Sequence, residues 1–207
     1  ASIRQAALVR TPSQDPPKSG MFVAQAGTCR SCHEKQYDFW EKTKHAWAYL
    51  VLFAKNQHFS PECIGCHSLG FYDPKGYRDI TAPLRLKDQP VRKPGETPFV
   101  EHLMKEVFEA DPGSGPLDSR EQPTRYAVLK KRYHEKIRGL QEEGKLTSLH
   151  MGVQCEHCHG LRDGHPRAGF KKVGKVTPDR CTVCHAPPHD ESFNFSKRLP
   201  QVACPRQ

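Results

Sequence analysis

Four short cysteine–histidine motifs constrain this chain more than any other feature of its sequence. Eight of the nine cysteines fall into four Cys-x-x-Cys pairs, and a histidine directly follows each pair. The motifs run from Cys29 to His33, Cys63 to His67, Cys155 to His159 and Cys181 to His185. The ninth cysteine, Cys204, stands alone near the C-terminus. The repetition indicates one chemical unit used four times.

Two other interpretations of Cys-x-x-Cys pairs have to be weighed. Pairs about 20 residues apart build zinc ribbons, and a single pair can act as a redox dithiol. Neither needs a histidine after the second cysteine. Histidine makes up only 12 of the 207 residues, so four such placements by chance are very improbable. The motifs therefore favour covalent haem attachment over zinc or dithiol chemistry.

The spacing suits c-type haem. Two thiols three positions apart match the two haem vinyl groups when the backbone makes a helical turn, and the next residue then supplies the proximal imidazole. The sequence thus predicts four covalently bound haem c groups. Their thioether residues are Cys29, Cys32, Cys63, Cys66, Cys155, Cys158, Cys181 and Cys184, and their proximal ligands are His33, His67, His159 and His185.

The rest of the composition agrees with haems in the interior. Hydrophobic residues are 36% of the chain, beside 18 prolines and 15 glycines, which is a thin supply for a side-chain core. Porphyrin faces can replace aliphatic side chains. We expect a mainly α, loop-rich multihaem cytochrome c with a haem-packed core and no large sheet. The expected parts are an extended tail over 1–20, one domain over 21–207, and helices at about 35–55, 98–110 and 123–143.

Charge and hydropathy limit the partners and the compartment. The formal charge is +9, but the basic residues are scattered, so we expect no nucleic acid partner. No stretch approaches the roughly 18 apolar residues of a transmembrane segment. Because haem of this kind is attached outside the cytoplasm, and because the chain starts at Ala1 without a methionine, we expect an exported protein whose leader has been removed. The expected location is periplasmic or extracellular.

Several segments resemble the tetrahaem cytochrome c-554 family, whose four-haem unit also occurs among filament-forming extracellular cytochromes. The first motif is followed by Phe39-Trp40 and Lys44-His45-Ala46, and the second is preceded by Pro61 and followed by Gly70-Phe71. The third lies within Gly152-Val-Gln-Cys-Glu-His-Cys-His-Gly160, with His165 downstream. The resemblance covers about 27–77 and 150–200, so the segment at about 80–148 has the character of an insertion.

The resemblance implies some distal ligands and leaves others open. It implies that His45 is the distal ligand of the third haem and His165 that of the first. His134 and His150 are further candidates, whereas His102 falls opposite the apolar stripe of its helix, which favours solvent or a neighbouring subunit. Relatives place a histidine near the position of Cys204 for the fourth haem. Here the thiol is an axial thiolate, half of an intermolecular disulfide, or an idle side chain.

The function indicated is electron transfer without catalysis, since the sequence shows no nucleotide site, flavin motif or conventional nucleophile–base arrangement. The protein would relay electrons through closely packed haems as a carrier, a complex subunit or a polymeric conduit. Its partners would be redox proteins, and a homo-oligomer or filament is expected. The alternative is a haem enzyme that reduces or oxidises a small nitrogen or sulfur compound at an iron that is open or thiolate-ligated.

Overall fold

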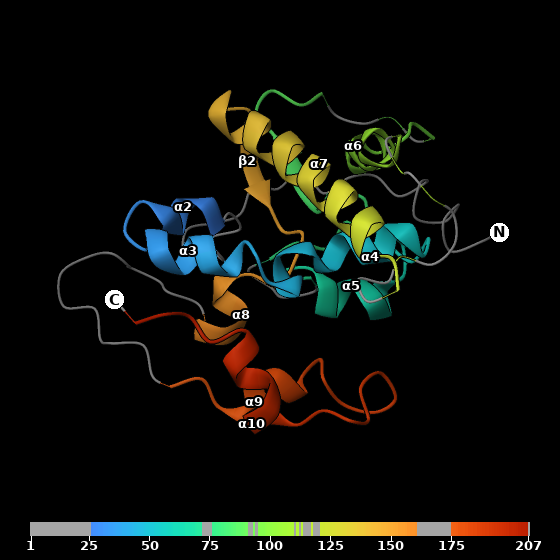
Figure 1. The fold of residues 1–207 in the computed structure, drawn as a ribbon. Helices are drawn as coiled ribbons and strands as arrows, with labels where there is room; N and C mark the ends of the chain where they lie inside the picture. Colours follow the sequence, from blue (N-terminus) through green and yellow to red (C-terminus); the bar gives the residue numbers. More distant parts are fainter. Residues whose placement is uncertain are drawn as a thin grey trace.

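The computed structural model describes most of the chain between residues 26 and 206. The expected tail over 1–20 and the candidate ligand His165 lie outside the described residues, which are 26–71, 76–90, 93, 95–109, 111, 113, 117, 121–160 and 175–206. In the described residues helices dominate and the sheet has two strands, which confirms the mainly α, loop-rich fold without a large sheet (Figure 1). The elements in chain order are α2 (Ala26–Arg30), α3 (Glu34–Trp40), η1 (Lys44–Trp47), α4 (Ala48–Ala54), α5 (Pro61–His67), β1 (Leu84–Leu86), α6 (Phe99–Phe108), α7 (Pro123–Glu142), β2 (Leu146–Leu149), α8 (Cys155–His159), α9 (Pro178–Thr182), α10 (Phe195–Arg198) and η2 (Leu199–Gln201).

The helix expected over about 35–55 is broken into α3, η1 and α4. The break falls at Thr43, whose backbone is extended and whose N–H and hydroxyl both donate to the Trp40 carbonyl at 2.8 Å. A threonine that bonds to a nearby carbonyl in this way competes with the helical ladder. The expectation of one continuous helix was wrong because apolar periodicity does not register this local competition.

The two helices expected in the segment at about 80–148 are present. α6 and α7 follow the expected bounds closely, and the stripe of α7 is buried at Leu129, Tyr133 and Ile137. α6 buries Val100, Leu103, Met104 and Val107, while His102 on its other side is exposed. In Figure 1, α7 passes over α4, so the segment at about 80–148 lies against the part of the chain between the first two motifs.

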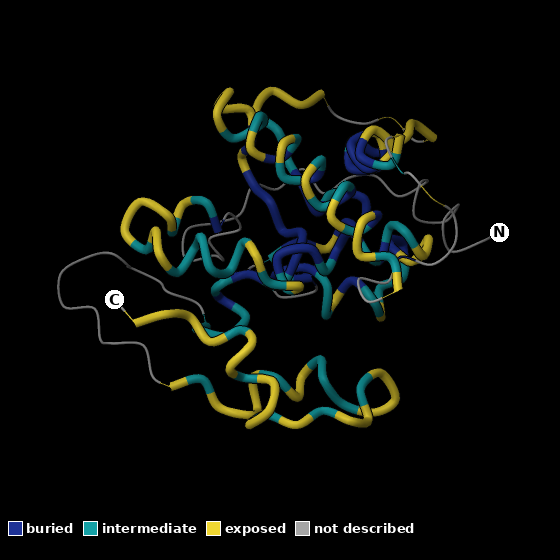
Figure 2. The backbone as a smooth tube through the Cα atoms, in the orientation of Figure 1, coloured by how far each residue is buried: buried dark blue, intermediate teal, exposed yellow. Residues whose placement is uncertain are grey.

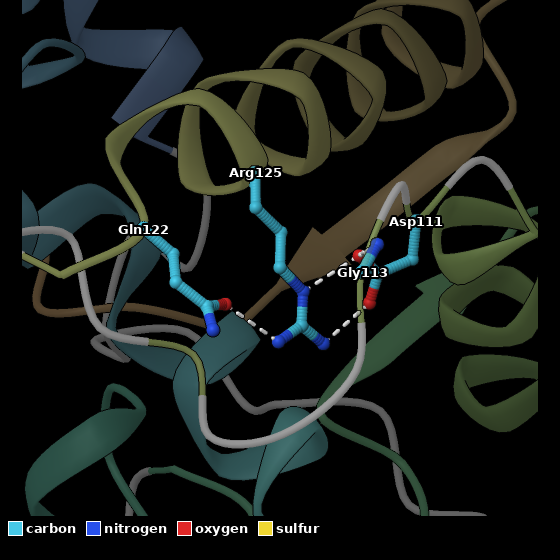
Figure 3. A network of polar contacts seen from close by, with 4 residues as sticks. All are labelled: Asp111, Gly113, Gln122 and Arg125. Atoms are coloured by element: carbon cyan, nitrogen blue, oxygen red, sulfur yellow. Dashed lines mark hydrogen bonds and ion pairs between the residues drawn. The ribbon is translucent and has the colours of Figure 1, made fainter.

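A compact ion pair fixes the start of α7 (Figure 3). The Arg125 guanidinium donates to both carboxylate oxygens of Asp111, at 2.6 and 2.5 Å, and to the side-chain oxygen of Gln122 at 2.8 Å. Asp111 also accepts from the Gly113 backbone N–H at 3.1 Å. The bidentate geometry ties the turn after α6 to the first turn of α7.

β1 and β2 form the antiparallel sheet of the described residues. Leu84 pairs with Leu149 and Arg85 with Ser148, and the register is irregular between Arg85 and Leu86. β2 leads directly toward the third cysteine motif, so the sheet anchors the segment that precedes it. Strand propensity over three or four residues is too weak a signal to predict such a sheet from sequence.

Buried side chains are distributed very unevenly (Figure 2). The hydrophobic cluster extends from Ala46 to Met151 and draws on α4, α5, α6, α7 and both strands. The described residues 175–206 contain no buried residue, and residues 27–44 contain none either. The core of the described chain is therefore made of side chains between 46 and 151, whereas the segments that carry the first and fourth motifs lack a side-chain core.

Candidate haem-binding site

All four motifs adopt the helical turn that thioether attachment needs. The second and third motifs lie within α5 and α8. In the first motif the His33 N–H donates to the Cys29 carbonyl at 2.9 Å, and in the fourth the His185 N–H donates to the Cys181 carbonyl at 2.9 Å. One helical turn thus places each pair of thiols on the same side, with the histidine next to them. This is the local geometry predicted from the spacing.

The motifs meet in two pairs through their cysteines. The Cys29 thiol lies close enough to that of Cys155 for its pKa to be lowered by it, and the Cys184 thiol lies close enough to that of Cys66 for its pKa to be raised by it. Burial, together with the neighbouring Cys66, raises the pKa of the Cys184 thiol to about 12, and burial raises that of Cys158 to about 11. The first motif therefore lies beside the third and the second beside the fourth.

A short segment between β2 and α8, residues 149–154, joins three of the motifs. Gln154, which is buried, accepts a hydrogen bond from the Ala26 N–H of α2 at 3.0 Å and donates to the carbonyls of Leu149 and Met151. The Gly152 N–H donates to the carbonyl of His67 at 3.0 Å. We call residues 149–154 the junction segment, because the first, second and third motifs are held around it.

His45 is held against the same junction segment. The Val153 N–H donates to the His45 carbonyl at 2.9 Å, and the Trp40 indole N–H donates to the Val153 carbonyl at 2.8 Å. Gly152 has a φ of 87°, and a Cβ there would lie 2.8 Å from the Ala46 carbonyl oxygen. Burial, followed by the neighbouring His185, His157 and His67, lowers the pKa of His45 to about 4. Its imidazole is therefore neutral at pH 7, as an iron ligand must be.

The proximal histidines of the second and fourth motifs have partners that set their tautomer. The His67 Nδ1 lies 2.7 Å from the carbonyl oxygen of Ala48, and the His185 Nδ1 lies 2.9 Å from the carboxylate of Asp190. A carbonyl and a carboxylate can only accept, so Nδ1 carries the proton in both rings. The lone pair then resides on Nε2, which is the usual arrangement of a metal-bound histidine.

His150 has the same arrangement in a buried position. Its Nδ1 lies 2.9 Å from the Leu69 carbonyl oxygen, and its ring centroid lies 4.5 Å from that of Tyr77. Burial lowers the pKa of His150 to about 4. The ring is neutral and carries its lone pair on Nε2, next to the exit of the second motif.

His134 and His157 are engaged in protein contacts. His134 packs edge-on against Trp47 at 3.8 Å between ring centroids, and its Nδ1 lies 3.3 Å from Glu41. Burial and the nearby Lys130 and Arg138 lower the pKa of His134 to about 4. His157 accepts from the Gln154 N–H through Nδ1 at 3.0 Å, so its proton is on Nε2, and the ring also bonds to the Ser68 backbone. Neither ring nitrogen of His157 offers a lone pair to iron.

Cys204 is exposed at the end of the described chain. The carbonyl of its neighbour Pro205 accepts from the Gln36 side chain at 3.0 Å, which brings the C-terminus to α3. The Cys204 thiol affects the pKa of Cys155 and of Cys158, and it therefore lies near the third motif. The resemblance had connected this position with the fourth haem.

The described part of the chain shows neither disulfides nor a clustered metal site. All nine cysteines are free, and no group of three or more His, Cys, Asp or Glu side chains in the described ranges could hold a metal ion. None of the described helices combines the length and the apolar character that a membrane crossing requires.

The residues present fit haem c. Each motif supplies two thiols and an imidazole on one turn, and at His67 and His185 the tautomer is the one that coordinates metals. The motif-bearing segments 27–44 and 175–206 lack buried side chains, and Val183, inside the fourth motif, is a 77% exposed apolar side chain that a porphyrin could cover. Sequence reasoning missed Asp190, although an acidic residue five positions after a proximal histidine is a detectable signal.

Comparison with known families supports the same conclusion. Residues 28–88, which contain the first two motifs, match the family described as cytochrome c554 and c-prime. Comparison with curated proteins and with solved structures found no significant match. The family implies covalently bound haem c, a role in electron transfer and, usually, export. Over these residues, the chain is similar to cytochromes of the c554 type.

Proposed function

We propose that this chain is a tetrahaem cytochrome that relays electrons through two haem pairs, one on the first and third motifs and one on the second and fourth. The observation that carries the proposal is the pairwise proximity of motif cysteines, Cys29 with Cys155 and Cys66 with Cys184. Thioether attachment at neighbouring cysteines keeps two porphyrins close. When bound, each haem supplies an iron that alternates between the ferric and ferrous states.

The protein side chains orient these groups. We propose His33, His67, His159 and His185 as proximal ligands and His45 as the distal ligand of the third haem. The assignment of His45 to the third haem rests on the resemblance: the bond from Val153 holds the His45 backbone near the third motif, while its ring lies 6.1 Å, between centroids, from that of His185 in the fourth. His165 remains the proposed distal ligand of the first haem, by resemblance.

For a further distal ligand the contacts favour His150 over His134. His150 presents a neutral ring with its lone pair on Nε2 beside the second motif, whereas His134 is packed on Trp47 and faces Glu41. Cys204 stays a proposed candidate axial ligand of the fourth haem, by resemblance. A periplasmic or extracellular location and redox partner proteins complete the proposal. Association into a homo-oligomer or filament stays a prediction, and native mass measurement tests it.

Mass spectrometry of the denatured protein tests the haem count. Thioethers survive unfolding while axial bonds do not, so we expect four added haem masses. Replacing Cys63 and Cys66 together by Ala removes one haem, whereas Cys204→Ala, the matched control, removes none. Fewer than four haems in the unaltered protein contradicts the tetrahaem proposal. The electron paramagnetic resonance spectrum distinguishes an electron-transfer protein from a haem enzyme. Electron transfer alone requires low-spin iron in all haems, whereas an enzyme needs a high-spin fraction.

A further inference from the structure

The proximal histidine of the fourth motif has an unusual set of neighbours among the described residues. The Nδ1–H of His185 donates to Oδ2 of Asp190 at 2.9 Å. The other oxygen of Asp190 accepts from the Ser192 hydroxyl at 3.4 Å, and the Asp190 N–H bonds to the Ala186 carbonyl at 3.1 Å. Phe193 stacks on the imidazole with centroids 4.8 Å apart and an interplanar angle of 16°. The carboxylate and the ring together fix the plane of His185.

The second motif provides an internal comparison. His67 donates its Nδ1–H at 2.7 Å as well, but its acceptor is the neutral backbone carbonyl of Ala48. A carboxylate acceptor draws the proton more strongly, so the imidazole gains anionic character and becomes a more basic ligand. A more basic ligand stabilises ferric over ferrous iron, and axial-ligand hydrogen bonding is a recognised determinant of haem potential.

We propose that Asp190 is a positioning residue that lowers the reduction potential of the haem held by Cys181, Cys184 and His185 below that of the haem held by Cys63, Cys66 and His67. The inference rests on the proposed function, because it needs haem at both motifs. It adds a direction to the relay. Since Cys66 and Cys184 lie near each other, the two haems form one pair, and an electron entering the pair passes from the fourth motif to the second.

Potentiometric titration of the purified holoprotein tests the proposal with Asp190→Asn. Asparagine keeps the size of the side chain and an oxygen that can accept from Nδ1, but it removes the charge. We expect the potential of one haem to rise by about 59 mV or more, which is a tenfold change in a one-electron equilibrium constant. A variant with both Cys181 and Cys184 changed to Ala identifies that haem, because its potential is the one missing from the titration.

Two further variants separate the hydrogen bond from other effects. Asp179→Asn removes the same charge from an exposed position in α9 of the same motif, and we expect all potentials to stay at their original values. Asp190→Glu keeps a carboxylate, and we expect a potential close to the original one. The largest g-value of the affected haem, which reports the anionic character of the axial imidazole, should change in Asp190→Asn and not in Asp179→Asn.

The outcomes distinguish this inference from the haem assignment. If mass spectrometry finds four haems in Asp190→Asn and no potential moves, or if Asp179→Asn moves the same potential equally, the role of Asp190 is refuted and the tetrahaem proposal stands. If the unaltered protein carries no haem at the fourth motif, the proposed function itself is wrong. If Asp190→Asn loses the haem of the fourth motif, Asp190→Glu provides the test. A haem retained at its original potential in Asp190→Glu supports the role of the carboxylate, and a raised potential refutes it.

Discussion

Replacing Gln154 by a side chain of similar volume should lower the free energy of unfolding by several kcal/mol. The Gln154 side chain, 3% exposed, accepts from the Ala26 N–H and donates to the carbonyls of Leu149 and Met151. It also takes part in a capping box with His157 at the start of α8. One amide therefore connects the first motif, the sheet and the third motif.

Gln154→Leu keeps the approximate size and removes every polar contact. Three backbone groups, at Ala26, Leu149 and Met151, then lose their partner inside the protein. An unsatisfied buried group costs about 1–3 kcal/mol. At the lower end of that range the free energy of unfolding falls by about 3 kcal/mol. The apolar contacts that leucine adds do not compensate, because the groups around it are backbone amides and carbonyls.

Guanidinium denaturation of the holoprotein, followed by far-ultraviolet circular dichroism, measures this loss. Gln89→Leu is the matched control, since Gln89 is exposed and its side chain accepts from the nearby Leu86 N–H at 3.2 Å. We expect the control to change the free energy of unfolding by no more than about 0.5 kcal/mol. If Gln154→Leu unfolds at the same denaturant concentration as Gln89→Leu, the junction segment does not depend on this amide and our description of it is wrong.

Three more substitutions test other contacts. Gly152→Ala should lower the free energy of unfolding by at least about 1 kcal/mol more than Gly95→Ala, measured by the same denaturation. Both glycines have positive φ, but a Cβ meets a carbonyl oxygen only at Gly152, so equal losses would refute the close approach. Asp111→Asn should destabilise the protein at pH 7, and the difference from the unaltered protein should shrink as the pH falls below about 4. The hydrogen bond from Arg125 lowers the pKa of Asp111 in the folded state, so its contribution is present above the unfolded pKa and is lost as pH falls through the folded one; a pH-independent difference would contradict this. His157→Gln should leave every low-spin haem signal in the absorption spectrum unchanged, and the loss of one would show that His157 is a ligand.

The sequence predicted the parts of this protein whose signal is local. The spacing within a Cys-x-x-Cys-His motif requires one helical turn, so the turns could be predicted from each motif alone. The stripe Leu129, Tyr133, Ile137 likewise predicted α7, because a period of 3.6 residues is imposed within a single element. The long apolar helix over 35–55 was wrong at Thr43, where one side-chain bond to a carbonyl outweighs the periodic pattern.

The contacts between distant segments were beyond sequence reasoning. Gln154 and Ala26 are 128 positions apart, and nothing in either neighbourhood specifies the other. The same holds for the pairing of motif cysteines and for the proton on His157, which depends on a neighbouring backbone N–H. The segment at about 80–148 shows what sequence reasoning missed: the resemblance treats it as an insertion, yet its residues supply much of the buried cluster.

The uneven distribution of buried side chains has a consequence for biogenesis. Between residues 46 and 151 the described side chains form a buried cluster, whereas none of the described residues 175–206 is buried by protein atoms. We expect the central part of the chain to become ordered first and to act as a template. The C-terminal segment would then stay accessible to the haem-attaching machinery until the porphyrin of the fourth motif provides an apolar surface against which it packs. Maturation of such a chain would proceed from the middle outward rather than from the first residue to the last.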